Sequence, residues 1–215
     1  MSESLSPTMI GAALVGGYLL GSIPFGVIAT RLGGAGDVRS IGSGNIGATN
    51  VLRTGRKDLA LITLLGDGGK GAVAVLLAWL ATRDKGVDAQ ALLTAIAGGA
   101  AFLGHLFPVW LKFRGGKGVA TFFGTLLAAA WPVGMAAGAT WIAMALLFRM
   151  SALAGLTAAA LAPLYAVFVF DRPYPVAAMA LFMAVLIYIR HKDNIARLLK
   201  GQEPKIGGKK DKEAA

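Results

Sequence analysis

The chain has 215 residues, of which 56% are hydrophobic and 15% are charged, and its formal net charge is +10. Its mean hydropathy of +0.66 is far above that of a soluble domain of this length, which excludes a water-exposed globular fold for most of the chain. Cysteine is absent, so disulfide frameworks, thiolate metal sites and thiol nucleophiles are excluded as well.

Seven apolar spans follow one another along the chain, and most have the length of about 20 residues that a helix needs to cross the hydrocarbon core. They cover 9–30, 58–81, 89–107, 118–130, 132–149, 151–170 and 174–190. We therefore predict an all-α, polytopic membrane protein with seven transmembrane helices, built as a single domain over 1–215. Only Trp131 and Pro132 separate the fourth span from the fifth, so a six-helix count stays open. Residues 201–215 are predicted to form a flexible cytoplasmic tail.

The connections between these spans differ in charge. Most of the 21 basic residues lie in 31–57, 112–117 and from residue 190 onward, whereas Arg83, Lys85 and Arg172 fall on the opposite side. The positive-inside rule then places the C-terminus in the cytoplasm and the N-terminus outside. Orientation signals and anionic headgroups explain the positive charge, so we expect no nucleic-acid partner, for which no recognition motif is present.

The first polar cluster follows the first span. It is a Gly-rich stretch that runs from Gly42 to Arg53, with Ser43, Gly44, Asn45, Thr49 and Asn50 as its candidate ligands. Frequent glycine lets backbone N–H groups turn toward one point, and the side chains add neutral donors and one fixed charge. This pattern is typical of a phosphate cradle. The alternative is a flexible loop capped by Ser and Asn.

Two charged residues, Asp67 and Lys70, lie in the interior of the second span among four glycines. Charges inside a membrane are costly, so these two should face each other or a polar cavity. Structural pairing and a direct catalytic role both stay open at this point. The glycines predict a close approach of a neighbouring helix.

The second polar cluster begins at His105 and continues to Gly115-Gly116-Lys117-Gly118, at the start of the fourth span. A lysine between glycines at a helix N-terminus favours negative charge. Position 111 is leucine and Lys117 is followed by glycine, so this is not a Walker A loop and ATP is not implied. The alternative is a lysine that only reaches toward the membrane surface.

The third polar cluster closes the last span. Arg190, Asn194 and Arg197 fall on one helical stripe with His191 beside it, and Glu203 follows. Such a stripe can face a shared polar cavity. The alternative is a cationic cap at the level of the lipid headgroups.

Together these motifs resemble the PlsY family of bacterial membrane acyltransferases. The resemblance rests on Gly21-Ser22-Ile23-Pro24-Phe25-Gly26, Ser43-Gly44-Asn45 through Arg53, Asp67 with Lys70-Gly71, Gly104-His105 through Gly115-Gly116-Lys117-Gly118, and His191 with Asn194, Arg197, Gly201, Glu203 and Lys205. These motifs occur in the family's order and cover nearly the whole chain. The second-helix motif departs from the pattern because it is unusually rich in glycine.

The resemblance implies an acyltransferase that moves the acyl group of an acyl phosphate to sn-glycerol 3-phosphate, giving 1-acyl-sn-glycerol 3-phosphate (lysophosphatidic acid) and phosphate in phospholipid synthesis. It implies a place in the bacterial cytoplasmic (inner) membrane and neither a metal nor an organic cofactor. The expected catalytic residues are Ser43, Arg53, Lys117, His191 and Asn194. The expected substrate-binding residues are Gly44, Asn45, Thr49, Asn50, His105, Gly116, Gly118, Arg197 and Glu203.

The expected partners are the two substrates, membrane lipid and the soluble enzyme that makes acyl phosphate. The alternative function is a membrane transporter of organic phosphates, which would also need basic residues and broken helices. A transporter should place its site near the midplane between two related halves, whereas this chain groups its polar clusters at one face and shows no internal repeat.

Overall fold

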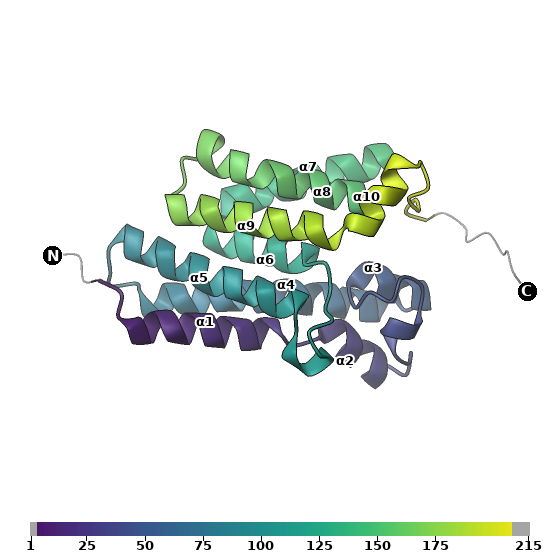
Figure 1. Cartoon of the computed structure of the whole chain (residues 1–215), viewed down its shortest axis with the longest axis horizontal. Coiled ribbons are helices and arrows are strands. Elements are labelled where there is room, and N and C mark those ends of the chain that lie inside the picture. The colour runs from purple at the N-terminus through teal and green to yellow at the C-terminus, as the bar shows by residue number, and fades with distance from the viewer. Residues whose placement is uncertain (1–3, 208–215) are drawn as a thin grey trace, which may run out of the picture.

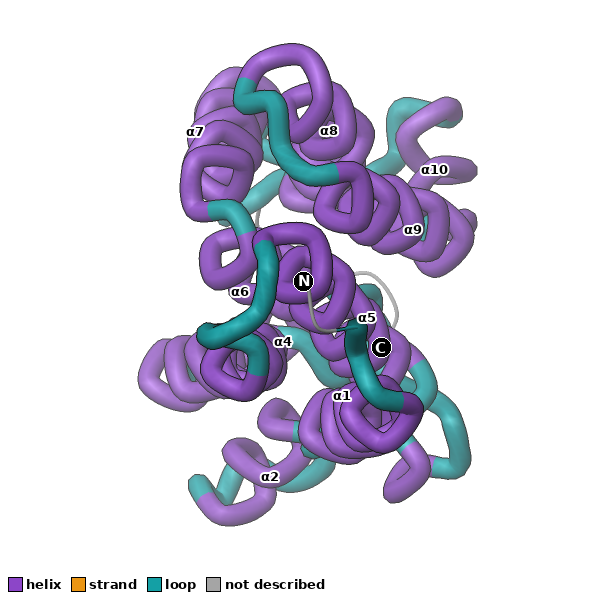
Figure 2. Tube along the Cα trace, turned by 90° about the vertical axis from the view of Figure 1, so that its left-hand side faces the viewer, coloured by secondary structure: helices purple, strands orange, loops and turns teal. Residues whose placement is uncertain are grey.

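The structure, a computed structural model, describes residues 4–207 as helices joined by loops (Figure 2). The long helices are α1 (Pro7–Gly21), α4 (Lys57–Ala81), α5 (Val87–Leu106), α7 (Trp131–Phe148), α8 (Ser151–Leu164, continued by a π-helical turn at Tyr165–Val169) and α9 (Tyr174–Arg190). The shorter ones are α2 (Phe25–Leu32), α3 (Ala48–Val51), α6 (Val119–Ala129) and α10 (Lys192–Leu199). The predicted all-α fold is confirmed.

Helices α1, α4, α5, α6, α7, α8 and α9 run in alternating directions through the bundle (Figure 1). The start of α1, the α4–α5 connection and the α8–α9 connection lie at one end, and α2, α3 and α10 lie at the other. Helices distant in sequence pack together, notably α1 with α5, α4 with α6 and α5 with α9. The three polar clusters of the sequence therefore gather toward the end that carries α3 and α10.

The first predicted span is broken between α1 and α2. Pro24 has no N–H to donate, so the helix ends at Gly21 and a new helix begins at Phe25. The break frees the carbonyl of Ile23, which accepts a hydrogen bond of 2.8 Å from Lys70 Nζ in α4. A lysine from a neighbouring helix thus satisfies the freed backbone group, as the low polarity of a membrane requires.

The glycines of α4 allow α6 to approach closely. A Cβ atom at Gly124 of α6 would lie 1.9 Å from the carbonyl oxygen of Gly68, and one at Gly71 would lie 2.5 Å from Thr125 Oγ1. Side chains at these positions would push the two helices apart, so Gly68 and Gly71 of the second-helix motif serve the contact between α4 and α6.

The predicted count of seven spans is not confirmed. Among residues 4–207, five helical segments are long and apolar enough to cross a membrane, and a sixth follows if α9 and α10, bent by 65°, are taken as one span. The segment predicted at 118–130 is the 11-residue helix α6, whose length of about 16 Å is half the ~30 Å hydrocarbon core. We treat α9 as the spanning helix of the bent pair and α10 as lying at the membrane surface.

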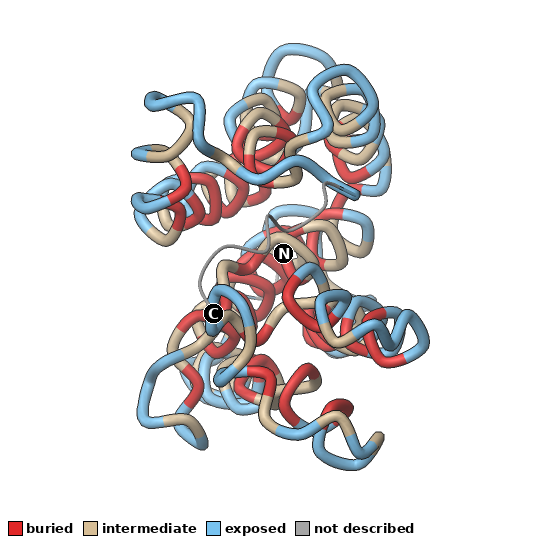
Figure 3. The backbone as a smooth tube through the Cα atoms, turned by 90° about the vertical axis from the view of Figure 1, so that its right-hand side faces the viewer, coloured by how far each residue is buried: buried red, intermediate tan, exposed pale blue. Residues whose placement is uncertain are grey.

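Buried residues lie on the helix faces that point into the bundle, and the outer faces are exposed (Figure 3). Large apolar side chains such as Leu146, Leu147 and Phe168 point outward with 75%, 75% and 79% of their surface exposed. In water such a surface would drive aggregation, whereas lipid tails solvate it. The chain is therefore a multi-pass membrane protein.

Candidate active site

The loop after α2 is organised by Asn50, which is 3% exposed. Its Nδ2 donates to the carbonyl oxygens of Val38, Ile41 and Asn45 at 2.8–3.0 Å, and its Oδ1 accepts from the backbone N–H of Ser43 at 3.1 Å. One side chain thus fixes the whole turn. Asn50 was predicted to bind substrate, and the structure uses its hydrogen-bonding groups to shape the loop that carries Ser43.

Ser43 and Arg53 lie against the same turn and are both exposed. A Cβ atom at Gly42 would lie 2.6 Å from one terminal nitrogen of Arg53, so the guanidinium rests directly on the glycine backbone. Gly42 and Gly44 have φ values of +55° and +68°, which favour glycine. Thr49 is exposed on α3, close to this loop. The arrangement presents hydroxyls and one fixed cation to solvent, as a phosphate site requires.

A buried ionic cluster lies deeper in the bundle. Lys70 Nζ is 2.9 Å from Asp67 Oδ1, and His105 Nδ1 is 3.5 Å from the same oxygen. The three side chains are at most 3% exposed. The sequence left pairing and catalysis open for Asp67 and Lys70, and the structure shows the pair, extended by His105 from α5.

His105 connects this cluster to the loop between α5 and α6, which carries the second polar cluster of the sequence. A Cβ atom at Gly116 would lie 2.2 Å from His105 Nε2, so the loop backbone rests on the imidazole. The N–H groups of Gly115 and Gly116 donate to the carbonyls of Leu106 and His105, each at 3.1 Å. These two N–H groups are therefore bonded within the protein, and the two glycines serve the close packing of the loop.

Arg190 holds the same loop from the other side. It donates to the carbonyl oxygen of Gly115 at 2.8 Å and to that of Gly116 at 3.1 Å, and it lies over the ring of Phe107. The sequence placed Arg190 on the polar stripe but did not select it as a site residue. Because its planar guanidinium donates to two consecutive carbonyls, Arg190 is a positioning residue. In the sequence, only its place at the end of the last apolar span indicated such a role.

The side chain of Lys117 extends from this loop to the third cluster. Its Nζ hydrogen bonds Asn194 Oδ1; Asn194 Nδ2 donates to Glu203 Oε1 at 2.6 Å, and Arg197 Nε donates to Glu203 Oε2 at 2.8 Å. Burial lowers the pKa of Lys117, an effect that the nearby Glu203 carboxylate opposes. The result is a hydrogen-bond network of two cations, one amide and one carboxylate. Gly118 starts α6 with φ +87°, where a Cβ would collide with Phe102.

His191 occupies the bend between α9 and α10 and is 3% exposed. Its Nδ1 is 2.8 Å from the carbonyl oxygen of Ile187. Burial lowers the pKa of His191 to about 4, so its imidazole is neutral at pH 7. With the proton on Nδ1 and donated to Ile187, its Nε2 is an acceptor that can orient a hydroxyl.

The structure therefore assembles the predicted residues into two groups at one end of the bundle. Ser43, Asn50 and Arg53 form the first, and Lys117, Asn194, Arg197 and Glu203 form the second, with His191 next to it. Across residues 4–207, no hydrogen bond or ion pair joins the two groups directly. Within the same residues, His, Asp and Glu side chains form no set of three that could hold a metal ion.

The predicted tail at 201–215 is partly tied to this site. Glu203 belongs to the second group, and Ile206 and Arg149 exchange hydrogen bonds between the C-terminal segment and the α7–α8 turn. The remaining residues of that prediction, 208–215, lie outside the part of the chain that the structure describes.

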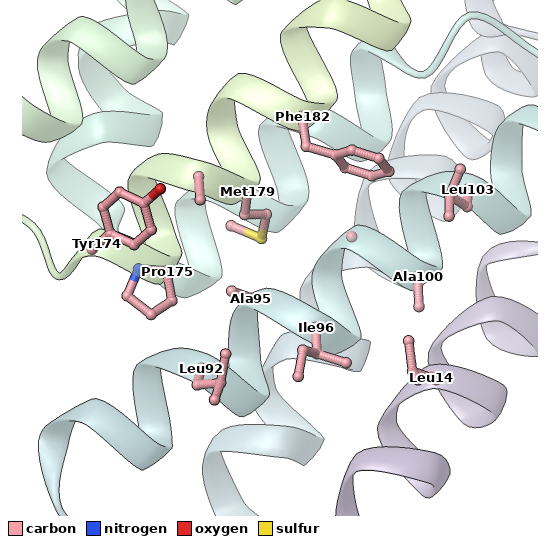
Figure 4. Close-up of a pocket in the computed structure, with 12 residues that line it drawn as sticks. Leu14, Leu92, Ala95, Ile96, Ala100, Leu103, Tyr174, Pro175, Met179 and Phe182 are labelled. Atoms are coloured by element: carbon pink, nitrogen blue, oxygen red, sulfur yellow. The ribbon is translucent and has the colours of Figure 1, made fainter.

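An apolar pocket of about 400 Å³ lies between α1, α5 and α9 (Figure 4). Leu103, Ala100 and Ile96 of α5 form one wall, and Met179 and Phe182 of α9 form the opposite wall. Leu103 is two residues before His105, so one end of the pocket lies near the loop between α5 and α6. From there the pocket extends along α5 toward the other end of the bundle. Its lining suits an alkyl chain.

Comparison with known proteins gives a consistent result. Residues 11–201 match the family model described as Glycerol-3-phosphate acyltransferase. A glycerol-3-phosphate acyltransferase of Caulobacter vibrioides is 72% identical over 206 residues, covering 96% of this chain and 92% of the relative. One of Rhodospirillum rubrum is 59% identical over 211 residues, covering 98% and 97%. The crystal structure of PlsY, an integral membrane glycerol 3-phosphate acyltransferase, in its glycerol 3-phosphate form superposes with a TM-score of 0.83 at 38% identity, covering 92% of this chain and 96% of that one.

Proposed function

The chain belongs to the glycerol-3-phosphate acyltransferase (PlsY) family and is a membrane acyltransferase that acylates glycerol 3-phosphate, and from this premise we propose that its acyl donor is an acyl phosphate. The products are then 1-acyl-sn-glycerol 3-phosphate and inorganic phosphate. Because the family is one of acyltransferases, we no longer favour the alternative function of an organic-phosphate transporter. We further propose that the site faces the cytoplasm of a bacterial inner membrane, with the N-terminus outside.

One observation carries the donor assignment, namely that the candidate site has two separate groups with cations, both at the same end of the bundle. Arg53 stands exposed beside Ser43, and Lys117 stands partly buried beside Asn194. The reaction brings two phosphates together, one on glycerol 3-phosphate and one as the leaving group of the acyl phosphate. Two separate cationic groups suit two phosphates, and the apolar pocket next to α5 offers room for the acyl chain.

In the proposed reaction the 1-hydroxyl oxygen of glycerol 3-phosphate attacks the acyl carbonyl carbon. The new C–O ester bond forms, the bond between that carbon and the phosphate oxygen breaks, and phosphate leaves with the electron pair. The hydroxyl proton passes either to the Nε2 atom of His191 or to a substrate phosphate. Lys117 and Arg53 stabilise the negative charge, while Asn194 and His191 orient the glycerol end, so positioning and electrostatics supply most of the rate.

The other major family of glycerol-phosphate acyltransferases uses His-x-x-x-x-Asp toward a thioester donor. Here Trp110 lies five residues after His105, and Ala196 lies five residues after His191. Nor does Asp67 supply an aspartate for His191, since it is paired with Lys70 and His105 inside the bundle. The residues present therefore favour a donor with a small phosphate leaving group.

The test gives the purified enzyme glycerol 3-phosphate with either palmitoyl phosphate or palmitoyl-CoA and measures lysophosphatidic acid. We expect product from palmitoyl phosphate only, with one phosphate released per acyl transferred. Comparable product from the CoA ester would overturn the donor assignment while leaving the acylation of glycerol 3-phosphate intact.

A further inference from the structure

A second pocket, which is polar, lies outside the two groups of site residues. Its volume is about 690 Å³, and it opens between the loop after α2 and the loop after α5. Arg39, Lys112 and Arg114 line it, together with Trp110 and the backbone at Gly44 and Gly115. The two glycines are neighbours of Ser43 and Gly116, so the pocket borders the catalytic loops without including their functional side chains.

The charge of this pocket is positive. Its one acidic residue, Asp37, is held by Arg39 at 2.6 Å and by Arg31 at 3.0 Å, so its charge is already compensated. Lys112 and Arg114 are exposed, and both face the pocket without a carboxylate beside them in its lining. A concave surface with two such cations attracts an anion.

Exposed apolar side chains neighbour these cations in the sequence. Trp110 is 63% exposed, Phe113 58% and Val109 39%, all within the same short loop. The loop backbone is fixed, since Phe113 N–H donates to the Pro108 carbonyl at 3.0 Å and Arg114 N–H to the Leu111 carbonyl at 3.1 Å. Cations alone would suffice to bind a water-soluble anion. Exposed aromatic rings beside cations are instead typical of proteins at the membrane interface.

We propose that this pocket binds the phosphate headgroup of an anionic membrane phospholipid. Lys112 and Arg114 contact the phosphate, while Trp110 and Phe113 lie among the upper parts of the acyl chains. The bound lipid holds the catalytic face at a fixed depth in the interface, next to the loop that carries Lys117. This inference goes beyond the acyl-transfer reaction and does not depend on which acyl donor the enzyme uses.

The experiment measures lipid binding and not turnover. The full-length protein in a neutral detergent is titrated with dihexanoyl phosphatidylglycerol or dihexanoyl phosphatidylcholine, and bound lipid is counted by native mass spectrometry. Lys112→Gln and Arg114→Gln each remove one cation of the pocket. Arg83→Gln is the matched control, because Arg83 is also exposed but lies in the α4–α5 connection at the opposite end.

We expect the wild type to bind the anionic lipid more tightly than the zwitterionic one, and each pocket variant to weaken anionic binding about fivefold. The Arg83→Gln variant should bind like the wild type. Equal binding of the two lipids, or an equal loss in the Arg83 variant, would overturn the proposal. Displacement of the lipid by millimolar glycerol 3-phosphate would also overturn it, because the pocket would then take a water-soluble phosphate. Acyl transfer assayed on the same samples reports the proposed function separately.

Discussion

Removing the Lys117 ammonium is the most direct perturbation of the site. Its Nζ lies partly buried beside Asn194, where a phosphate oxygen would be stabilised by a charge in a medium of low polarity. A charge-assisted contact of this kind contributes about 3 kcal/mol to the transition state. We therefore expect Lys117→Ala to lower kcat roughly a hundredfold.

The assay follows phosphate release by the purified protein in detergent with palmitoyl phosphate and glycerol 3-phosphate. Lys192→Ala is the matched control, since Lys192 is an exposed lysine on α10, next to His191. It should keep the wild-type kcat, and both variants should elute from size exclusion as the wild type does. Turnover near the wild-type value for Lys117→Ala would remove this lysine from the chemistry.

The lowered pKa of Lys117 gives the same residue a pH signature. A lysine whose pKa is lowered loses its proton at a pH below its usual range, so activity that needs the ammonium declines earlier on the alkaline side. Lys117→Arg keeps its charge at high pH. If it retains activity, its alkaline limb should move to higher pH; an unchanged limb in an active variant would refute the assignment to Lys117.

Three further predictions test the other parts of the structure. Arg53→Ala should lower kcat/KM roughly a hundredfold with normal folding, because it removes the fixed charge beside Ser43, and steady-state kinetics measure this loss. Asp67→Asn should destabilise the protein by about 3–5 kcal/mol, since it leaves Lys70 buried without its carboxylate; thermal unfolding measures the loss, and Asp67→Leu with Lys70→Met should recover part of it. A cysteine at position 43 should resist an impermeant thiol reagent applied outside the cell, whereas one at Arg172 should react; the reverse pattern would invert the orientation.

The apolar spans, the polar clusters and the family resemblance can all be identified from the sequence. Membrane helices must satisfy their backbone internally and face lipid with apolar side chains, so runs of such residues identify them directly. The exception is α6: its residues are as apolar as those of its neighbours, but composition does not limit its length to the 11 residues observed. The sequence therefore predicts seven crossings, whereas residues 4–207 contain five or six segments long enough to span.

Lys117, Asn194 and Glu203 could be selected as candidates from the sequence, because each stands in a short polar cluster of an apolar chain. Their connection was not predictable in detail, since the hydrogen bond between Lys117 and Asn194 joins residues separated by 77 positions. The same holds for Arg190, which the sequence placed on a polar stripe and which in the structure donates to the Gly115 and Gly116 carbonyls.

The membrane as solvent, the helical class and the candidate residues for phosphate binding could all be predicted from the sequence, because hydrophobicity and local motifs are properties of neighbouring residues. Which polar side chains hold the loops, and which are available to a ligand, could be read only from the packed structure. Asn50 and His105 are polar residues within site motifs, and both are buried against backbone. That distinction depends on which distant segments close over a side chain, and it arises only when the helices pack.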